Sequence, residues 1–294
     1  MSTVGAAAPR TATPKARGER RLSAANRATL SIICFVIGAV GLIPLIWTLS
    51  LSIRTSSDVF SDRILPHSFR LSNFVDAWNQ FGLGTLFWHS IVVTFGTVVI
   101  TTVLAVTSAY GFNRYRTRVT EAIFVVILTG LMVPPAAVII PFFVAMTRLG
   151  LYNTLVSVVI GESVFALPFS LLLLRGYINT IPLELTDAAR VDGASQLQAF
   201  RYVALPLLKP ALATVALFST ISTWNGFLLP LVLLNNSATS TLTVGLTSVQ
   251  SQYGALNLQL LSAAAVLAIL PILAVFVAAR RYYVQGLSAG AVKQ

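Results

Sequence analysis

Apolar residues in this chain of 294 residues gather in long runs instead of alternating with polar ones. A helix needs about 20 consecutive apolar residues to cross roughly 30 Å of hydrocarbon. Runs of about this length lie at residues 28–52, 86–112, 121–147, 153–175, 207–234 and 258–279. Backbone groups in lipid must be paired, and unbroken apolar runs lack the alternation of barrel strands. The pattern therefore predicts an all-α integral membrane protein with six transmembrane helices.

The distribution of basic residues predicts how these helices are oriented. If the N-terminus is cytoplasmic, 16 of the 20 Lys and Arg residues fall on cytoplasmic segments. Cytoplasmic loops of membrane proteins carry such an excess, so both termini are expected in the cytoplasm. Topology and attraction to anionic membrane lipid then explain the net charge of +11, and no nucleic-acid partner is needed.

The segments outside the core of the chain have distinct expected roles. Residues 1–27 are rich in Ala, Thr, Pro, Ser and Arg and predict a disordered basic cytoplasmic tail. The first helix, at residues 28–52, should remain as a membrane anchor. Residues 53–85 and 235–257 are polar enough to emerge outside, and residues 286–294 form a predicted cytoplasmic C-terminal tail.

The sequence lacks the motifs of common enzymes and metal sites. One cysteine and two histidines give no zinc-site spacing, and no G-x-x-x-x-G-K-[ST] phosphate loop occurs. The nine acidic residues are scattered, except for Glu184, Asp187 and Asp192. A membrane enzyme would need polar catalytic groups that converge near one interface. We therefore predict no catalytic residue, no metal site and no cofactor held by this chain.

A polar island at residues 182–210 interrupts the apolar pattern on the predicted cytoplasmic side. Pro182 and Glu184 suit the first turn of a helix that should run to about Asp192, and Gly193 suits a left-handed cap. One face of this helix should be nearly flat, and it consists of Ile181, Leu185, Ala188 and Ala189. The residues alone fit an amphipathic connector on the membrane surface as well as a docking site for another protein.

The second half of the island predicts another short helix. Ser195 and Gln198 have the spacing of a capping box, which should start this helix, and Leu205-Pro206 should end it. On the first helix, Asp187 and Arg190 are three residues apart and are expected to pair on the surface.

Residues 186–194, followed by Leu205-Pro206, resemble the EAA loop of membrane subunits in bacterial ABC importers. Further matching motifs occur in order at residues 133–135 with 140–141, 148–154, 166–169, 174–177, 224–225 and 286–293. Together they resemble carbohydrate-uptake permeases, specifically the six-helix subunit similar to the smaller permease of maltose-type importers. The likeness covers roughly residues 28–294.

The resemblance implies an ABC importer type-1 transmembrane domain over residues 86–285. It implies a permease subunit of an ATP-driven importer of mono- or oligosaccharides in the bacterial cytoplasmic membrane, without an ATPase site of its own. Asp187, Ala188, Ala189 and Gly193 would belong to a coupling helix that docks in a groove of an ATP-binding subunit. The implied partners are two such subunits, which bind ATP and Mg, a second permease that forms a heterodimer, an extracytoplasmic sugar-binding protein, and membrane lipid.

Three residues are candidates for the substrate pathway. Glu162 and Asn225 should reach a similar depth in the fourth and fifth predicted helices, where ionisable and polar groups are costly and usually face a bundle interior or a cavity. Glu162 would contact a sugar hydroxyl, and Trp224 would stack on a sugar ring. Alternatively, Glu162 hydrogen-bonds to a neighbouring helix as packing. Gly226 departs from the Trp-Asn-Glu-Phe run common in the family, as Asp187 departs from Glu in the EAA motif.

Pro134 and Pro135 are candidates for a hinge that serves alternating access, because an interior proline frees a carbonyl and kinks a helix. Two other classes of function remain. A secondary transporter driven by an ion gradient would carry intramembrane acids or an inverted repeat, and Glu162 is the one acid that fits. A membrane enzyme would need the catalytic cluster that the sequence lacks.

Overall fold

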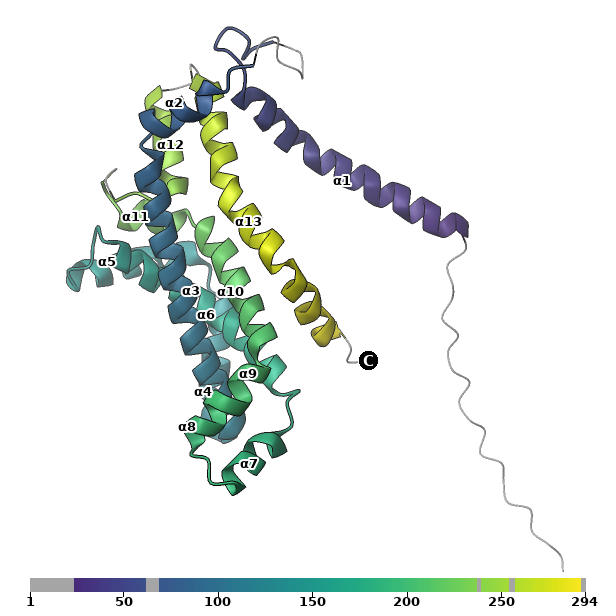
Figure 1. The fold of residues 1–294 in the computed structure, drawn as a ribbon. Helices are drawn as coiled ribbons and strands as arrows, with labels where there is room; N and C mark the ends of the chain where they lie inside the picture. The colour runs from purple at the N-terminus through teal and green to yellow at the C-terminus, as the bar shows by residue number, and fades with distance from the viewer. Residues whose placement is uncertain (1–23, 62–68, 237–238, 254–256, 292–294) are drawn as a thin grey trace, which may run out of the picture. The chain divides into compact units, whose positions relative to one another are not determined.

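Every element in the described part of the computed structural model is a helix (Figure 1). The described residues are 24–61, 69–236, 239–253 and 257–291. The predicted tail lies outside them up to residue 23, and a helix begins at Ala24. The chain comprises two compact units, Met1–Ile46 and Trp47–Gln294.

Four helices are long and apolar enough to cross a membrane singly. They are α1 (Ala24–Ser52), α3 (Leu83–Arg114), α6 (Leu155–Ile178) and α13 (Leu258–Ala291). Two bent helix pairs raise the number of candidate spans in the described residues to six. The structure thus confirms the all-α class and accommodates six spans, two of them broken. It also extends α13 to Ala291, into the predicted C-terminal tail.

The third predicted span is broken at its two prolines. It consists of α4 (Arg118–Thr129), the 3-10 helix η1 (Gly130–Met132) and α5 (Pro135–Arg148), and the two parts meet at an angle of 108°. Pro134 is extended, with φ −66° and ψ 132°, because the following proline disfavours helical geometry in the residue before it. Pro135 then takes the first position of α5, where a missing amide hydrogen costs nothing.

The fifth predicted span is also discontinuous. The helical segment Gln196–Leu207 meets α10 (Lys209–Trp224) at 73°, and α10 ends before the next short helix, α11 (Leu228–Leu233). The segment Asn225–Phe227 therefore forms a break between α10 and α11.

Helices α3, α6 and α10 form the packed centre of the second unit. On α3, Gly96 allows close approach, because a Cβ built there would lie 3.2 Å from the methyl carbons of Val159 on α6. Leu171 and Leu174 of α6 are fully buried and belong to the same apolar cluster as Ala105 and Ala109 of α3. Helix α7 lies at one end of these packed helices (Figure 1).

The predicted outer loop at residues 53–85 contains a helix, α2 (Ser72–Gln80), which packs against α13. Asn73 is buried, and its side-chain amide donates hydrogen bonds to the carbonyl oxygens of Ser52 and Arg54 at 2.9 and 2.8 Å. The fully buried Arg54 donates to the Ser50 hydroxyl and to the carbonyl oxygen of Asp58. These bonds fold the chain after α1 into a compact turn.

The second predicted outer segment is also helical. α12 (Leu242–Tyr253) lies beside α3 at the same end as α2 (Figure 1). The backbone amide of Leu242 donates to the Ser90 hydroxyl at 2.8 Å, and Gly245 packs tightly on Leu86. Two polar side chains of this segment also bond outside it: the Thr243 hydroxyl donates to the carbonyl oxygen of Gly226 at 2.6 Å, and the Thr239 hydroxyl donates to Oδ1 of Asn153 at 3.0 Å.

Candidate functional site

The first predicted helix of the polar island is present as α7 (Leu183–Val191). Pro182 caps it instead of starting it, and Glu184 lies in its first turn, where an acid complements the helix dipole. Gly193 has φ +90°, as predicted for a left-handed cap. The amide of Ala194 donates to the carbonyl oxygen of Ala189 at 2.9 Å, which closes the end of the helix.

The second helix of the island starts as predicted and ends close to the predicted proline, but it contains a π-helix that was not predicted. Ser195 and Gln198 form both bonds of a capping box ahead of α8 (Gln196–Ala199). The chain stays helical through a π-helix, η2 (Phe200–Ala204), and α9 (Leu205–Leu207), and this segment ends one residue beyond Pro206, where it meets α10 at 73°. The wider π turn changes the carbonyl positions that would otherwise clash with the proline ring.

The surface of α7 and α8 exposes the predicted coupling residues. Asp187, Ala188 and Gly193 are exposed, and Ala189 is partly buried. The same polar island exposes Val191 and Leu197, two apolar side chains that sequence reasoning missed, and Tyr202. Val191 is 88% exposed. Apolar side chains that are this exposed to solvent on a short helix are typical of a protein contact surface.

The acid of the motif pairs with a distant residue. Nη1 of Arg114, the last residue of α3, lies 2.7 Å from Oδ1 of Asp187, so the predicted pair of Asp187 with Arg190 is replaced by one that spans 73 positions. The neighbouring Tyr115 hydroxyl donates to Oε1 of Gln196 at 2.8 Å. Both bonds join the end of α3 to the polar island.

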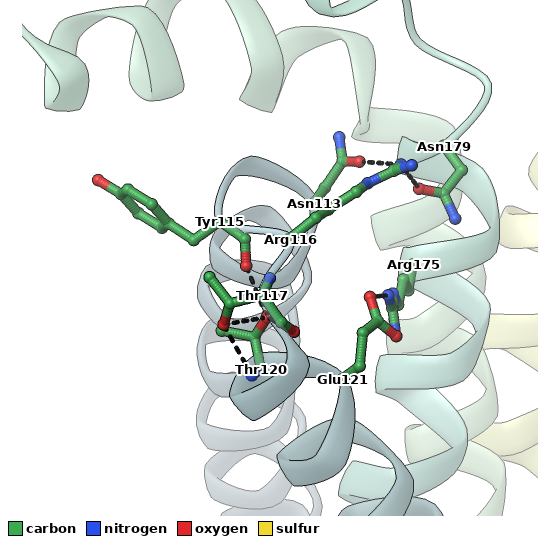
Figure 2. A network of polar contacts seen from close by, with 8 residues as sticks. All are labelled: Asn113, Tyr115, Arg116, Thr117, Thr120, Glu121, Arg175 and Asn179. Atoms are coloured by element: carbon green, nitrogen blue, oxygen red, sulfur yellow. Dashed lines mark hydrogen bonds and ion pairs between the residues drawn. The ribbon is translucent and has the colours of Figure 1, made fainter.

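A further polar network joins the ends of α3, α4 and α6, as Figure 2 shows. Arg116 donates from Nη2 to Oδ1 of Asn113 at 2.7 Å and to Oδ1 of Asn179 at 2.8 Å. Glu121 of α4 forms an ion pair with Arg175 of α6. The corner between α3 and α4 is capped by Thr117 and Thr120, which exchange hydrogen bonds as a capping box. Charged groups thus fix three helix ends together.

The candidate substrate residues lie around the break between α10 and α11. Glu162 is the only charged residue of α6 besides Arg175 in the last turn. A Cβ built on Gly226 would lie 2.6 Å from Oε1 of Glu162 and 2.9 Å from the carbonyl oxygen of Thr223. The Glu162 carboxylate therefore occupies the space that a side chain at position 226 would need. Asn225, next to it, is exposed and donates from Nδ2 to the carbonyl oxygen of Ile221.

Trp224 is the last residue of α10 and directly precedes this break. It is 7% exposed, its indole Nε1 donates to the carbonyl oxygen of Ala268 on α13 at 3.1 Å, and its ring contacts Phe87 edge-on. It also lines a cavity of about 240 Å³ with Thr94 of α3 and Pro271 of α13. The structure brings Glu162 beside the Asn225–Phe227 break and packs Trp224 against α3 and α13.

Several buried hydroxyl groups in the membrane-spanning helices have no hydrogen-bond partner among the described residues. They belong to Thr94, Thr97, Thr101 and Thr102 of α3, Ser163 of α6, and Ser219 and Thr223 of α10. Buried polar groups are normally bonded, so these hydroxyls are exceptions among the described residues. No group of three His, Cys, Asp or Glu side chains in the described part of the chain could hold a metal ion.

Comparison with known proteins connects these features to a family. A family model described as "Binding-protein-dependent transport system inner membrane component" matches residues 101–289. The melibiose/raffinose/stachyose import permease protein MelC of Bacillus subtilis is 30% identical over 265 residues, which cover 90% of this chain and 96% of that protein. The diacetylchitobiose uptake system permease protein NgcG of Streptomyces coelicolor is 30% identical over 277 residues, which cover 94% and 90%.

The fold matches a solved structure as well. One chain from the crystal structure of a bacterial ABC transporter involved in the import of the acidic polysaccharide alginate aligns with a TM-score of 0.79 and 28% identity. The alignment covers 89% of this chain and 99% of that chain.

Proposed function

The chain belongs to the family of binding-protein-dependent transport system inner membrane components, as a permease subunit of a bacterial carbohydrate-uptake ABC importer, and we propose that it couples ATP hydrolysis by partner subunits to sugar translocation through α7. It is a multi-pass protein of the cytoplasmic membrane and a transport component without its own ATPase site. The cytoplasmic end of the bundle, on this assignment, is the end that carries α7 and α8.

The observation that carries this proposal is the exposed surface of α7. Ala188 and Val191 are exposed apolar residues of α7 that another protein's groove can cover, while Asp187 is bonded to the end of α3. A short helix held at both ends by membrane helices transmits a rigid-body motion, whereas a loose loop would absorb it. Asp187, Ala188, Ala189 and Gly193 are the coupling residues in this proposal.

The proposal assigns ATP and Mg to two cytoplasmic ATP-binding subunits. This chain has no phosphate loop, so the energy of nucleotide hydrolysis must enter through a protein contact. A second, similar permease completes the translocation pathway as a heterodimer. On the outer side, a sugar-binding protein delivers the substrate near α2 and α12.

The proposed substrate is a mono- or oligosaccharide, as the names of the relatives MelC and NgcG describe for those proteins. Glu162 and Asn225 lie at the break between α10 and α11, where hydroxyl groups of a sugar can exchange hydrogen bonds with them. Trp224 contributes the wall of the adjacent cavity. Pro134 and Pro135, at the 108° bend, are the proposed hinge.

Uptake into sealed membrane vesicles tests the energy source. The complete complex, with its partner permease, ATP-binding subunits and binding protein, is supplied with radiolabelled raffinose and diacetylchitobiose as probes, because relatives are named for these sugars. Accumulation that requires ATP and persists after ionophores remove all ion gradients supports the proposal. Accumulation that follows an imposed ion gradient without ATP would instead identify a secondary transporter.

A further inference from the structure

Three consecutive residues at the cytoplasmic end of α3 each bond to a different part of the chain. Arg114 pairs with Asp187 of α7, Tyr115 donates to Gln196 of α8, and Arg116 donates to Asn179 at the end of α6. The partners are 73, 81 and 63 positions away in the sequence. We call residues 114–116 the clamp segment.

The first bond is a close contact between two charged groups. The side chain of Arg114 is 19% exposed and that of Asp187 is 51% exposed, so the arginine is the more enclosed partner. An N–O distance of 2.7 Å between charged groups marks a charge-assisted hydrogen bond, which is stronger than a neutral one. Arg114 also lies at the negative end of the α3 dipole, where a cation is stabilised.

The other two bonds restrict how α7 and α8 can move. Tyr115 caps the end of α3 and leaves the helical geometry, with φ −112° and ψ 77°. Its hydroxyl bonds to Gln196, the first residue of α8, just beyond the Gly193 turn. Arg116 holds Asn179, which caps α6 just before α7 begins. The clamp segment therefore contacts the chain before α7, within α7 and after α7.

From this arrangement we propose that the clamp segment positions the coupling helix, so that motion delivered to α7 enters the membrane through α3 as well as through the covalently attached α6. This rests on the proposed function for the identity of the moving partner. It assigns Asp187 an intrachain role: its carboxylate fixes the orientation of α7, and the exposed Ala188 and Val191 face the ATP-binding subunit. Arg114, Tyr115 and Arg116 are positioning residues.

A charge swap tests this role in the assembled complex in lipid nanodiscs. Arg114→Asp and Asp187→Arg each place two like charges together, and the double variant restores an opposite pair in reversed order. Asp187→Glu keeps the charge and serves as the conservative rescue. The matched control is the reversal of Arg70 and Asp76, an ion pair with a 3.3 Å N–O distance that lies outside the cytoplasmic end.

Two readouts are measured for each variant. The first is the rate of Mg·ATP hydrolysis per assembled complex. The second is the distance distribution between spin labels at Val103, on the exposed side of α3, and Val191, at the end of α7, in a Cys34→Ser background. Cys34 is the only cysteine, so this background leaves the two introduced cysteines as the only labelling sites.

Each single reversal should slow hydrolysis about tenfold and broaden the distance distribution, because a charge-assisted bond is replaced by repulsion. The double variant and Asp187→Glu should recover most of the rate and the narrow distribution, and the control pair should change neither. Unchanged distances in the single variants would overturn the proposal. So would a double variant that regains no hydrolysis, since Asp187 would then act directly on the partner. A wild-type complex that hydrolyses no ATP refutes the proposed function instead, and the distances still decide the clamp.

Discussion

The cytoplasmic end of the bundle and the break between α10 and α11 use polar residues in opposite ways. At the cytoplasmic end, Arg114, Arg116 and Arg175 each have a partner on another segment. Around the break between α10 and α11, buried hydroxyls such as that of Thr223 have no partner among the described residues, and Glu162 lies against the bare backbone of Gly226. The first region holds helices together, and the second contains polar groups that no contact within the described residues satisfies.

This difference fits the two tasks of a transporter subunit. Motion can pass between proteins only through a stiff contact, and fully bonded charged networks are rigid. A sugar moving through the membrane needs groups that can exchange their partners, because each of its hydroxyls loses water on the way. The two regions therefore differ in how many of their polar groups are already satisfied within the chain.

The largest expected effect comes from filling the free space at the break. Gly226→Ala puts a Cβ within 3 Å of both Glu162 and the Thr223 carbonyl oxygen, and overpacking of this kind costs about 1–3 kcal/mol. We expect a lower unfolding temperature of the purified complex and a loss of uptake. Gly111→Ala is the matched control, because no heavy atom lies within 4 Å of the position that its added methyl group would take. Equal stability of both variants would contradict the close contact.

A smaller effect is expected from removing the Glu162 carboxylate. Glu162→Ala should lower sugar uptake about tenfold, the cost of one lost hydrogen bond to a translocated hydroxyl, while Glu162→Gln keeps part of the activity. Assembly with the partner subunits and basal Mg·ATP hydrolysis should stay the same. Uptake by Glu162→Ala at the wild-type rate would assign this residue to helix packing alone.

The smallest effect is expected at the bend between α4 and α5. Replacing Pro134 and Pro135 by alanine restores two amide donors and favours a continuous helix, which opposes the 108° bend. Initial uptake rates should fall a few-fold, with unchanged membrane insertion measured by carbonate extraction. The hinge proposal is abandoned if uptake in this double variant equals that of the wild type.

Local features of the sequence predicted much of this architecture. The apolar runs located the membrane helices, and the Pro182, Gly193 and Ser195 signals located α7, its cap and the start of α8 within one residue. These features depend on neighbours within one helical turn, so single-sequence reasoning reaches them. The π-helix before Pro206 was missed because it depends on how the whole segment turns toward α10.

Contacts between distant segments were not predictable in the same way. The local spacing does not show that Asp187 pairs with Arg114 instead of with the nearer Arg190. The approach of Glu162 to Gly226 depends on the packing of α6 against the break, and the bond from Trp224 to Ala268 depends on the position of α13. The concentration of arginines at residues 114–118 was the one available signal for a network at this end.

Crosslinking from α7 tests the coupling role most directly. The variant Ala188→Cys is made in a Cys34→Ser background. Position 188 is exposed on the surface of α7, and the substitution leaves the Arg114–Asp187 pair intact. We predict that a short bifunctional reagent joins this cysteine to the ATP-binding subunit, and that the yield changes between nucleotide-free and ATP-bound complexes. A cysteine at Val103 on α3 should give no such product. If Ala188→Cys captures no ATP-binding subunit in a complex that still takes up sugar, coupling through α7 is contradicted.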